Sequence, residues 1–338
     1  MIEFNNEQIG NGDQPFIVAE VGVNFRDDIE LGKAFIEEAA EAGADAVKFQ
    51  THIPSAEMVE SEMDALGMSD LYDRMGVYEL SMEEHRELKQ HCEDCDITFL
   101  STPFSPAAVE RLEKLDVGAY KVGSGELTNH HLLRTIAETG KPMIVSTGMH
   151  GMATVQEAAA LLDKHASEYM FLYCVSEYPT EPSDFNLGLI QRMEAEFDVP
   201  IGFSDHSTGV EAAAIAMARG ATLVEKHFTI DRRLPGGDQE VSIEPEELQK
   251  LVEYATLCHK TKGDDKEVRD GEVSIAEWAR HSVVTTSQVA TGETLTAEQL
   301  TTKRPGTGIP ATEFDETVGR VAARDLEANR TLQEADLE

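Results

Sequence analysis

The stretch 201–229 constrains the fold of this chain more than any other, because it has the pattern of a strand, a helix and a second strand. A short apolar run begins at Ile201, an Ala-rich segment with helical spacing covers 210–219, and a second apolar run covers 223–229. A unit this compact makes the two strands parallel neighbours. The polar residues at their carboxyl ends, which include His206 and His227, should therefore emerge side by side on one rim.

The same pattern recurs along the chain up to residue 262. Short, mostly apolar runs alternate with segments of helical periodicity, and the units repeat about every 25 to 30 residues. Eight such units are typical of a TIM barrel, an α/β fold of about 250 residues, and a doubly wound open sheet is the alternative. The expected strands are 16–23, 46–51, 98–103, 119–126, 142–148, 170–176, 201–203 and 223–229.

The character of the sequence changes after residue 262. Residues 262–271 are charged and contain Gly, and from His281 onward the chain is rich in Val, Thr and Gly without a long helical period. The last part is too small for catalysis by itself. We expect a TIM-barrel catalytic domain at 1–265, a linker at 266–279 and a small β-rich domain at 280–338.

One connection within the barrel region is unusually long. Residues 53–80 follow the second expected strand, are rich in Met and acidic residues, and exceed the length of an ordinary βα loop. We therefore predict that this segment is a lid or a substrate loop.

The charge balance narrows the range of partners. Lys and Arg total 28 against 64 Asp and Glu, which gives a formal net charge of −36 at pH 7. Such a surface argues against nucleic acid and anionic membranes as partners, and it suggests a halophilic host. The sequence has no apolar run of membrane-spanning length, no signal-peptide pattern at its start and only four cysteines. We expect a cytoplasmic protein.

Two lysines stand out against this acidic background because both fall on expected strand ends. Lys48 lies on the second strand and Lys121 on the fourth, where Gly123 and Gly125 would let backbone amides approach a ligand. Together with nearby hydroxyl groups, the two ammonium groups would bind a small molecule that carries a phosphate and a carboxylate. The alternative is that the lysines extend into solvent. The hydroxyl groups belong to Thr102, Ser124, Ser146 and Ser204.

Two histidines on the rim are candidate metal ligands. His206 and His227 would supply two nitrogen atoms and leave other positions for water and substrate oxygens, an open site suited to polarising a carbonyl. The alternative is that both are hydrogen-bonded structural residues. Glu225 should point into the same barrel face as His227, two residues away. Glu20 and Glu126 are candidates for proton transfer or for binding sugar hydroxyls, or else they pair with the two lysines.

Nine motifs resemble the N-acetylneuraminate (sialic acid) synthase family, in the same order and along essentially the whole chain. They are IVAEVGVN, VKFQT, FLSTPFS, YKVGSGE, STGM, SEYPT, GFSDHS, VEKHFT and KRPGTGI. The resemblance implies a TIM barrel followed by a C-terminal antifreeze-like SAF domain of the β-clip type. It also implies an enzyme that condenses phosphoenolpyruvate with N-acetylmannosamine or a close analogue, with C–O cleavage and release of phosphate. The implied metal is Mn²⁺, with Mg²⁺ or Co²⁺ as alternatives.

The same resemblance implies roles for individual residues. His206 and His227 would hold the metal, and the catalytic residues would be Glu20, Lys48, Lys121 and Glu126. Phosphoenolpyruvate would contact Lys48, Thr102, Lys121, Ser124, Ser146 and Ser204. The amino sugar would contact Glu20, Gln50, Glu126, Tyr178 and Asp238. Because members of this family form domain-swapped homodimers, Arg304 of the partner subunit would reach the N-acyl group of the sugar.

Two departures from the family pattern concern the sugar rather than the reaction. Ser176 stands where many such synthases have Asn. Gln239 follows Asp238, at a position where the family commonly has His after the aspartate. The alternative within the family is a legionaminic acid synthase that uses 2,4-diacetamido-2,4,6-trideoxymannose. More remote alternatives are a metal-dependent aldolase or lyase on the same barrel and a carbohydrate-binding protein without catalysis.

Overall fold

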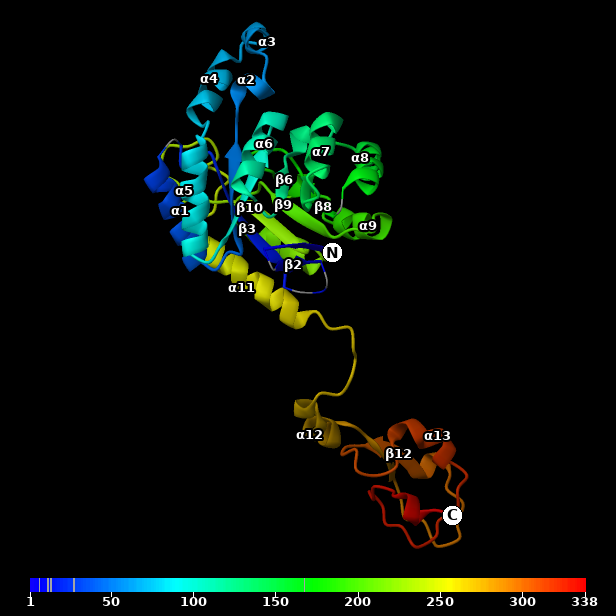
Figure 1. Cartoon of the computed structure of the whole chain (residues 1–338). Helices are drawn as coiled ribbons and strands as arrows, with labels where there is room; N and C mark the ends of the chain where they lie inside the picture. Colours follow the sequence, from blue (N-terminus) through cyan, green and yellow to red (C-terminus); the bar gives the residue numbers. More distant parts are fainter. Residues whose placement is uncertain (6, 11, 13, 27, 167) are drawn as a thin grey trace. The chain divides into compact units, whose positions relative to one another are not determined.

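The computed structural model describes residues 1–338 except residues 6, 11, 13, 27 and 167 (Figure 1). The chain forms two compact units, Met1–Lys262 and Gly263–Glu338. No helix in the described ranges combines the length and the apolar character that crossing a membrane requires.

The first unit is built around eight parallel strands that form a nearly closed barrel. They are β3 (Phe16–Gly22), β4 (Ala46–Thr51), β5 (Thr98–Pro103), β6 (Tyr120–Val122), β7 (Met143–Ser146), β8 (Tyr169–Cys174), β9 (Ile201–Asp205) and β10 (Leu223–His227). Hydrogen bonds join them in the order β5-β4-β3-β10-β9-β8-β7-β6, and β5 also lies next to β6. The predicted TIM-type barrel is confirmed, and the open doubly wound sheet is wrong.

Helices follow the strands and cover the outside of the barrel (Figure 1). Their starts obey local capping rules: the side chains of Asp28, Ser105 and Asn129 each accept a backbone N–H of the first turn, and Ser81 forms a capping box with Glu84. The helices are α1 (Ile29–Glu41), α5 (Met82–Asp94), α6 (Pro106–Leu115), α7 (His130–Ala137), α8 (Met152–His165), α9 (Gly188–Glu196), α10 (Glu211–Ala218) and α11 (Pro245–Thr261), with a short 3₁₀ helix η2 (Pro182–Asp184) before α9.

A small hairpin that sequence patterns did not reveal belongs to one end of the barrel. Strands β1 (Ile2–Phe4) and β2 (Glu7–Ile9) pair antiparallel and bury Ile2, Phe4 and Ile9. These side chains share a hydrophobic cluster with residues at the amino ends of the barrel strands, such as Phe16 and Leu223. The amino end of the barrel is therefore filled with apolar side chains, which leaves the carboxyl ends of the strands for a cavity.

The fourth barrel strand is shorter than predicted. Only Tyr120–Val122 forms strand β6, and Ser124–Glu126 turns into the 3₁₀ helix η1, in which Glu126 N donates to Gly123 O over 3.0 Å. The sequence 119–126 therefore does not continue as one strand. The turn brings Ser124 to the barrel mouth and gives Glu126 a different direction from that of a strand residue.

The long connection after β4 contains three short helices, α2 (Pro54–Glu57), α3 (Glu60–Ala65) and α4 (Ser69–Val77). Figure 1 shows α3 and α4 extending beyond the helices that surround the barrel. Every residue of α3 and α4 is exposed or half-buried, and Leu66 between them is 72 % exposed. We call residues 53–80 the excursion; its predicted role as a lid or substrate loop stays a prediction.

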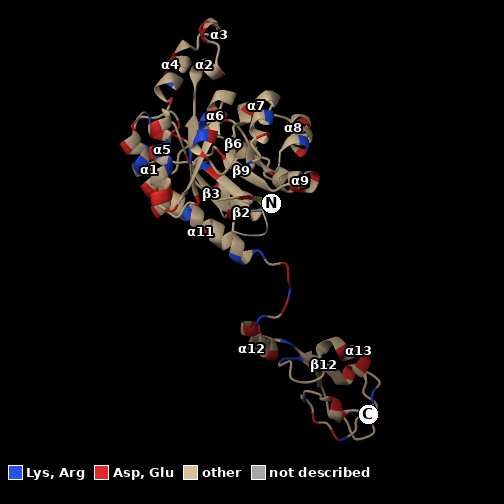
Figure 2. Cartoon of the chain, in the orientation of Figure 1, with Lys and Arg blue, Asp and Glu red and all other residues tan. Residues whose placement is uncertain are grey.

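Acidic residues account for the charge of the molecular surface. Figure 2 shows them on barrel helices such as α1, α5 and α9 and again on the helices of the second unit. The formal charge of −36 is therefore spread over the outside of both units. The halophilic setting stays a prediction.

The second unit is a small β-containing domain with its own core. Strands β11 (Ser282–Thr285) and β12 (Leu300–Lys303) pair antiparallel, and Val283, Leu295, Leu326 and Leu332 are buried together. The remaining elements are η3 (Ala297–Gln299), η4 (Ala311–Glu313), α13 (Phe314–Thr317) and η5 (Glu334–Asp336).

The segment 266–279, expected to be a linker, contains a helix. This helix, α12 (Asp270–Ala279), belongs to the second unit, which begins at Gly263, whereas the small domain was expected at 280–338. Glu272 accepts the backbone N–H of Arg269 over 2.9 Å and so caps the first turn. The polar composition of the segment concealed the helix, because its apolar residues, including Trp278, are exposed.

Candidate active site

A cavity of about 570 Å³ opens at the carboxyl ends of the barrel strands. The end of almost every strand contributes a polar side chain to it, as the βα geometry of such barrels predicts. Twelve of the fourteen predicted site residues line this cavity: Glu20, Lys48, Gln50, Thr102, Lys121, Ser124, Ser146, Tyr178, Ser204, His206, His227 and Asp238.

Strand register brings distant residues to the same level of the barrel. His227 on β10 pairs in register with Glu20 on β3, and Glu20 pairs with Lys48 on β4. On the other side of β10, Glu225 pairs with Ser204 on β9. Because neighbouring parallel strands align these positions, Glu20 and His227 meet although more than two hundred positions separate them in the sequence.

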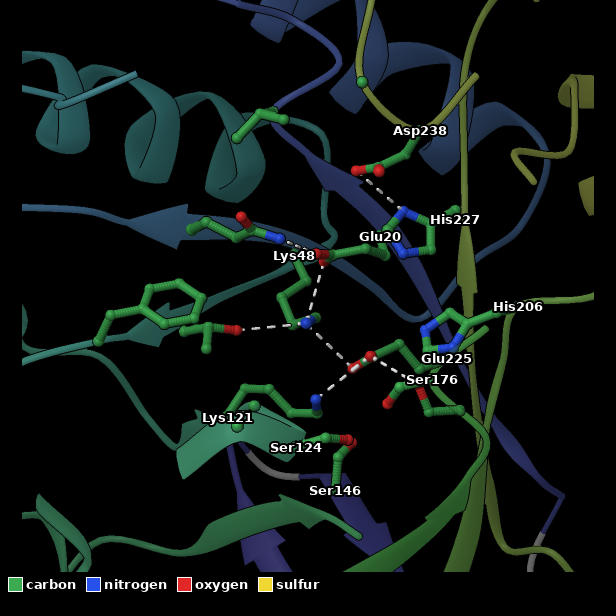
Figure 3. Close-up of a pocket in the computed structure, with 18 of the residues that line it drawn as sticks. Glu20, Lys48, Lys121, Ser124, Ser146, Ser176, His206, Glu225, His227 and Asp238 are labelled. Carbon is green, nitrogen blue, oxygen red and sulfur yellow. Dashed lines mark hydrogen bonds and ion pairs between the residues drawn. The ribbon is translucent and has the colours of Figure 1, made fainter. Parts of the chain in front are cut away.

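Two lysines and two glutamates form the centre of the cavity, and we call Glu20, Lys48, Lys121 and Glu225 the ion cluster (Figure 3). Lys48 Nζ lies 3.1 Å from Glu20 Oε2 and 3.2 Å from Glu225 Oε2. Lys121 Nζ lies 3.2 Å from Glu225 Oε1. All four side chains are buried, so the alternative that the lysines extend into solvent is wrong. Glu20 pairs with Lys48, which confirms the alternative that Glu20 is an ion-pair partner of the lysines.

The two carboxylates of the ion cluster differ in their affinity for protons. Burial alone would raise the pKa of Glu225, but the ammonium groups of Lys121 and Lys48 outweigh it and hold that pKa at about 2. The pKa of Glu20 is raised, because burial and the charge of Glu225 together exceed the effect of Lys48. Glu225 therefore stays ionised, whereas Glu20 is the carboxylate that takes up a proton more readily.

Hydroxyl groups surround the ion cluster. Lys48 Nζ donates to Thr102 Oγ1 over 3.2 Å, and Ser204 Oγ donates to Glu225 Oε1 over 3.1 Å. Ser124 Oγ accepts the backbone N–H of Gly148 over 3.0 Å. Ser146 Oγ is buried and has no hydrogen-bond partner among the described residues. Buried hydroxyls are normally paired, so this one is suited to a ligand oxygen.

The two histidines lie together beside the ion cluster (Figure 3). Their ring centroids are 5.5 Å apart, and the Tyr178 ring stacks on His206 at 4.1 Å. His206 Nδ1 is 2.7 Å from the carbonyl oxygen of Val175, so Nδ1 carries a proton and, in the neutral ring, Nε2 has the free lone pair. Burial, with a contribution from His206 and Lys48, lowers the pKa of His227 well below its usual value, which leaves a neutral ring.

These histidines suit a divalent metal, since neutral imidazole nitrogens are its usual protein ligands. His227 Nδ1 is buried without a hydrogen-bond partner in the described part of the chain, and Asp238 Oδ2 lies 3.7 Å from it. Among the described residues, no three or more His, Cys, Asp or Glu side chains are grouped so that they could hold a metal ion by themselves. A metal held here would therefore depend on water and substrate oxygens for its other ligands.

A fully buried ion pair holds the turn that carries His206. Lys226 Nζ lies 3.1 Å from Asp205 Oδ2 and also donates to the carbonyl of Ser207. Asp205 Oδ1 accepts the backbone N–H of Ser207 over 2.8 Å and its hydroxyl over 2.7 Å. Because Asp205 and Lys226 point away from the barrel mouth, His206 and His227 beside them point toward it.

Two predicted site residues lie outside this cavity. Glu126 is half-buried in η1 and accepts a hydrogen bond from Asn129 Nδ2 over 2.7 Å. Arg304 belongs to the second unit, where its guanidinium lies 5.3 Å from the ring centroid of Trp278 and its Nε donates to Ala279 O. The proposed role of Arg304 therefore rests on the resemblance alone, and that of Glu126 rests on the resemblance and on its place after the fourth strand.

Sequence reasoning left several lining residues without a role. Glu225 was placed on the correct face by its spacing from His227, but its bridge between two lysines was not foreseen. Other lining residues gave no sequence signal beyond their positions after strands or in the excursion: His52, Arg74, Met75, Tyr78, Phe104 and Met149.

Comparison with known proteins identifies the family. The model of the NeuB family matches residues 35–267, more than half of the chain. The chain belongs to the NeuB family. Residues 280–338 of this NeuB-family chain also match the SAF domain, which confirms the predicted nature of the second unit.

Relatives of this NeuB-family chain match it over nearly its whole length. An uncharacterized protein of Methanocaldococcus jannaschii is 36 % identical over 99 % of this chain and 98 % of its own. The N,N'-diacetyllegionaminic acid synthase of Campylobacter jejuni is 34 % identical over 94 % of this chain and 98 % of its own. The crystal structure of the N-acetylneuraminic acid (sialic acid) synthetase of Leptospira borgpetersenii is similar, with a TM-score of 0.75 and 35 % identity over 82 % of this chain and 95 % of that one.

Proposed function

We propose that this NeuB-family chain is a phosphoenolpyruvate-dependent nonulosonate synthase. It would condense phosphoenolpyruvate with N-acetylmannosamine or a close analogue, break a C–O bond and release phosphate. The observation that carries the proposal is the position of the ion cluster directly beside the His206–His227 pair in one cavity. This arrangement offers an anion site and a carbonyl-activating site next to each other, as a condensation of these two substrates requires.

The anionic substrate would bind at the two lysines. Lys48 and Lys121 share the single charge of Glu225 and the more weakly ionised Glu20, so the cluster retains attraction for an added anion. Ser146 offers its unpaired hydroxyl, and Thr102, Ser124 and Ser204 supply further hydroxyls within the same cavity. Charge-assisted hydrogen bonds from lysines and hydroxyls are the usual means of holding phosphate and carboxylate groups.

The aldehyde of the sugar would bind beside the two histidines. His206 Nε2 and His227 Nδ1 would hold a divalent ion, Mn²⁺ with Mg²⁺ or Co²⁺ as alternatives, which when bound would polarise a carbonyl oxygen. Tyr178 stacks on the His206 ring in this part of the cavity and would contact the sugar there.

The residues of the ion cluster suit the charges that develop in the proposed reaction. The enol carbon of phosphoenolpyruvate would attack the aldehyde carbon and leave cationic character at the carbon that bears the phosphate. The ionised Glu225 carboxylate would stabilise that charge. Water would then add to this carbon, and Glu20 would take up the proton that the water loses. The tetrahedral intermediate would break its C–O bond, so that the bridging oxygen leaves with phosphate.

Two sugars are candidates for the second substrate. Gln50, Tyr178 and Asp238 face the space beside the histidines, and Ser176 lines the same cavity. The relative named N,N'-diacetyllegionaminic acid synthase favours a 2,4-diacetamido-2,4,6-trideoxymannose, whereas the similar crystal structure of a sialic acid synthetase favours N-acetylmannosamine. We further propose a domain-swapped homodimer in which Arg304 of the partner subunit binds the N-acyl group.

A phosphate-release assay tests this function. Purified protein is incubated with phosphoenolpyruvate and a panel of N-acyl hexosamines, with and without EDTA. We expect phosphate release only when both substrates and a divalent metal are present, with ¹⁸O from the bridging position of phosphoenolpyruvate recovered in phosphate. Turnover of pyruvate without phosphate release would instead indicate an aldolase or lyase. Sugar binding by calorimetry with no turnover of any substrate would indicate a carbohydrate-binding protein.

A further inference from the structure

A chain of hydrogen bonds runs from the excursion to the ion cluster through His52. His52 Nδ1 lies 3.0 Å from Oε1 of Glu57, which ends helix α2, and His52 Nε2 lies 3.0 Å from Gln50 Oε1. Gln50 Nε2 in turn donates to Glu20 Oε1 over 2.9 Å. The His52 ring is buried and stacks on Phe104, with centroids 4.3 Å apart and planes 8° from parallel.

The directions of these hydrogen bonds restrict where protons lie. An ionised Glu20 only accepts, so the amide of Gln50 must present its NH₂ group to Glu20 and its oxygen to His52. The oxygen of Gln50 only accepts as well, so His52 Nε2 must carry a proton. On the other side of the ring, Glu57 and His52 Nδ1 share one further proton, whichever of the two atoms holds it.

The opposite orientation of the Gln50 amide has a different consequence. It would present the amide oxygen to Glu20, an arrangement that forms a hydrogen bond only when Glu20 already holds a proton. Lys48 binds the other oxygen of Glu20, Oε2, and therefore does not determine which way the amide of Gln50 points. The proton on His52 Nε2 does determine it.

We infer that His52 is a positioning residue, which fixes the amide of Gln50 so that Glu20 remains an acceptor able to take a proton from water. The inference rests on the proposed function for the role of Glu20, but the arrangement of the amide is independent of it. Stacking on Phe104 holds the ring in its plane, and the link to Glu57 connects this arrangement to the excursion. The hydrogen bond from Gln50 also acts to lower the pKa of Glu20, against the larger effect of burial.

Two substitutions at the same position separate a positioning role from a packing role. His52→Phe keeps a flat ring against Phe104 and removes both nitrogen atoms, whereas His52→Gln replaces the ring but places an NH₂ group near the position of Nε2. We expect kcat for phosphate release to fall about tenfold or more in His52→Phe, the equivalent of one lost hydrogen bond in the transition state. KM for phosphoenolpyruvate should stay within about twofold, because its proposed contacts are unchanged.

In His52→Gln, most of the lost kcat should return even though the stacking on Phe104 is lost. Thermal unfolding of both variants separates these effects from loss of fold. Wild-type kcat in His52→Phe, or equally slow turnover in both folded variants, would overturn the inference.

A second measurement does not depend on turnover. In full-length protein labelled with ¹⁵N-histidine, the ring signals missing from His52→Phe belong to His52, and they report which nitrogen atoms carry protons. We expect a proton on Nε2, with or without one on Nδ1. A neutral ring protonated only on Nδ1 would overturn the inference. If the wild-type protein showed this proton but released no phosphate with any sugar, the proposed function would fail while the arrangement of His52 and Gln50 would stand.

Discussion

The ammonium group of Lys121 lies 3.2 Å from Oε1 of Glu225, and both side chains are buried at the mouth of the barrel. Lys48 lies 3.2 Å from the other oxygen of the same carboxylate. One glutamate therefore neutralises part of the positive charge of two lysines, and the same two lysines are the proposed binding site of the substrate anion. Because the pKa of Glu225 is about 2, a substrate anion has to bind beside an ionised carboxylate at physiological pH.

Replacing Glu225 by Gln should make the stability of the folded protein depend on a bound anion. The substitution keeps the size of the side chain but leaves Lys48 and Lys121 with only Glu20 as a carboxylate partner, which should lower the free energy of unfolding by about 3–5 kcal/mol. Phosphoenolpyruvate should then raise the melting temperature more in Glu225→Gln than in the wild type. The control is Glu110→Gln, at an exposed position of α6. Equal ligand-induced shifts in all three proteins would contradict this prediction.

Removing either candidate metal ligand should abolish metal-dependent turnover without unfolding the protein. His206→Ala and His227→Ala each delete one of two protein nitrogens, and too few ligands would remain to hold a divalent ion. Phosphate release measured against Mn²⁺ concentration should show no metal-dependent rate, while circular dichroism stays native. His131→Ala, at an exposed position of α7, is the matched control. Unchanged turnover in both site variants would remove the metal assignment.

Arg304 should affect the sugar and leave phosphoenolpyruvate binding unchanged. If Arg304 of the partner subunit binds the N-acyl group, Arg304→Ala should raise KM for the sugar about tenfold or more, the loss of one charged hydrogen bond. Trp278 is the only tryptophan, and the Arg304 guanidinium lies over its ring, so its fluorescence should change in the same variant.

Two further variants test this role. Lys303→Ala, next to Arg304 in the sequence, should leave KM for the sugar unchanged. A chain that ends before Gly271 should keep a folded barrel with almost no turnover. Full activity of this shortened chain would show that the second unit supplies nothing to catalysis.

Asp45→Asn should stabilise the protein at neutral pH but not at acidic pH. Burial raises the pKa of Asp45 from 3.8 to about 6, although the backbone N–H of Ile17 donates to its carboxylate. The folded state therefore binds the proton more tightly than the unfolded state, and stability is lost as pH rises from about 4 to 6. Asn avoids this loss, with a gain at pH 7.5 of at most about 3 kcal/mol.

The measurement is denaturant unfolding of both proteins at pH 4 and pH 7.5. The exposed Asp198→Asn serves as the control at both values. A similar difference between Asp45→Asn and the wild type at the two pH values would show that ionisation of Asp45 is not its cause.

Salt should stabilise the whole molecule. A net charge of −36 produces repulsion among exposed carboxylates, and the screening length falls from about 10 Å at 0.1 M salt to about 3 Å at 1 M. Melting temperature and phosphate release should therefore rise with KCl, whereas sucrose at equal osmolality should not reproduce the change in rate. Maximal stability and activity without added salt would contradict a halophilic adaptation.

Elements with strong local signals were predictable from the sequence. The boundaries of β4 and β5 match the expected ranges 46–51 and 98–103, because apolar runs bounded by turn residues determine them locally. The positions of Lys48 and His227 followed from the rule that barrel strands present their carboxyl ends to the site. The fourth strand was predicted too long, because a run of apolar and small residues does not reveal where Gly123 allows the chain to turn.

The partners of the site residues could not be predicted in the same way. That Lys48 contacts both Glu20 and Glu225 depends on the register between three strands, which the sequence of no single strand encodes. His52 lies one residue beyond β4, where no periodicity indicates direction, and its role depends on Gln50 and Glu57. The helices of the excursion escaped prediction because they are short and bury few apolar side chains.

The side chains of Ser124, Cys174 and Ser176 leave no room for a side chain at Gly148. A methyl group at this position would collide with the oxygen atoms of Ser124 and Ser176 and the sulfur of Cys174, and the backbone N–H of Gly148 already donates to Ser124. Evolution or engineering toward a sugar of another shape therefore cannot enlarge residue 148 alone. A larger residue at 148 would therefore have to be accompanied by changes at 124, 174 and 176, and these four positions are best varied as one set.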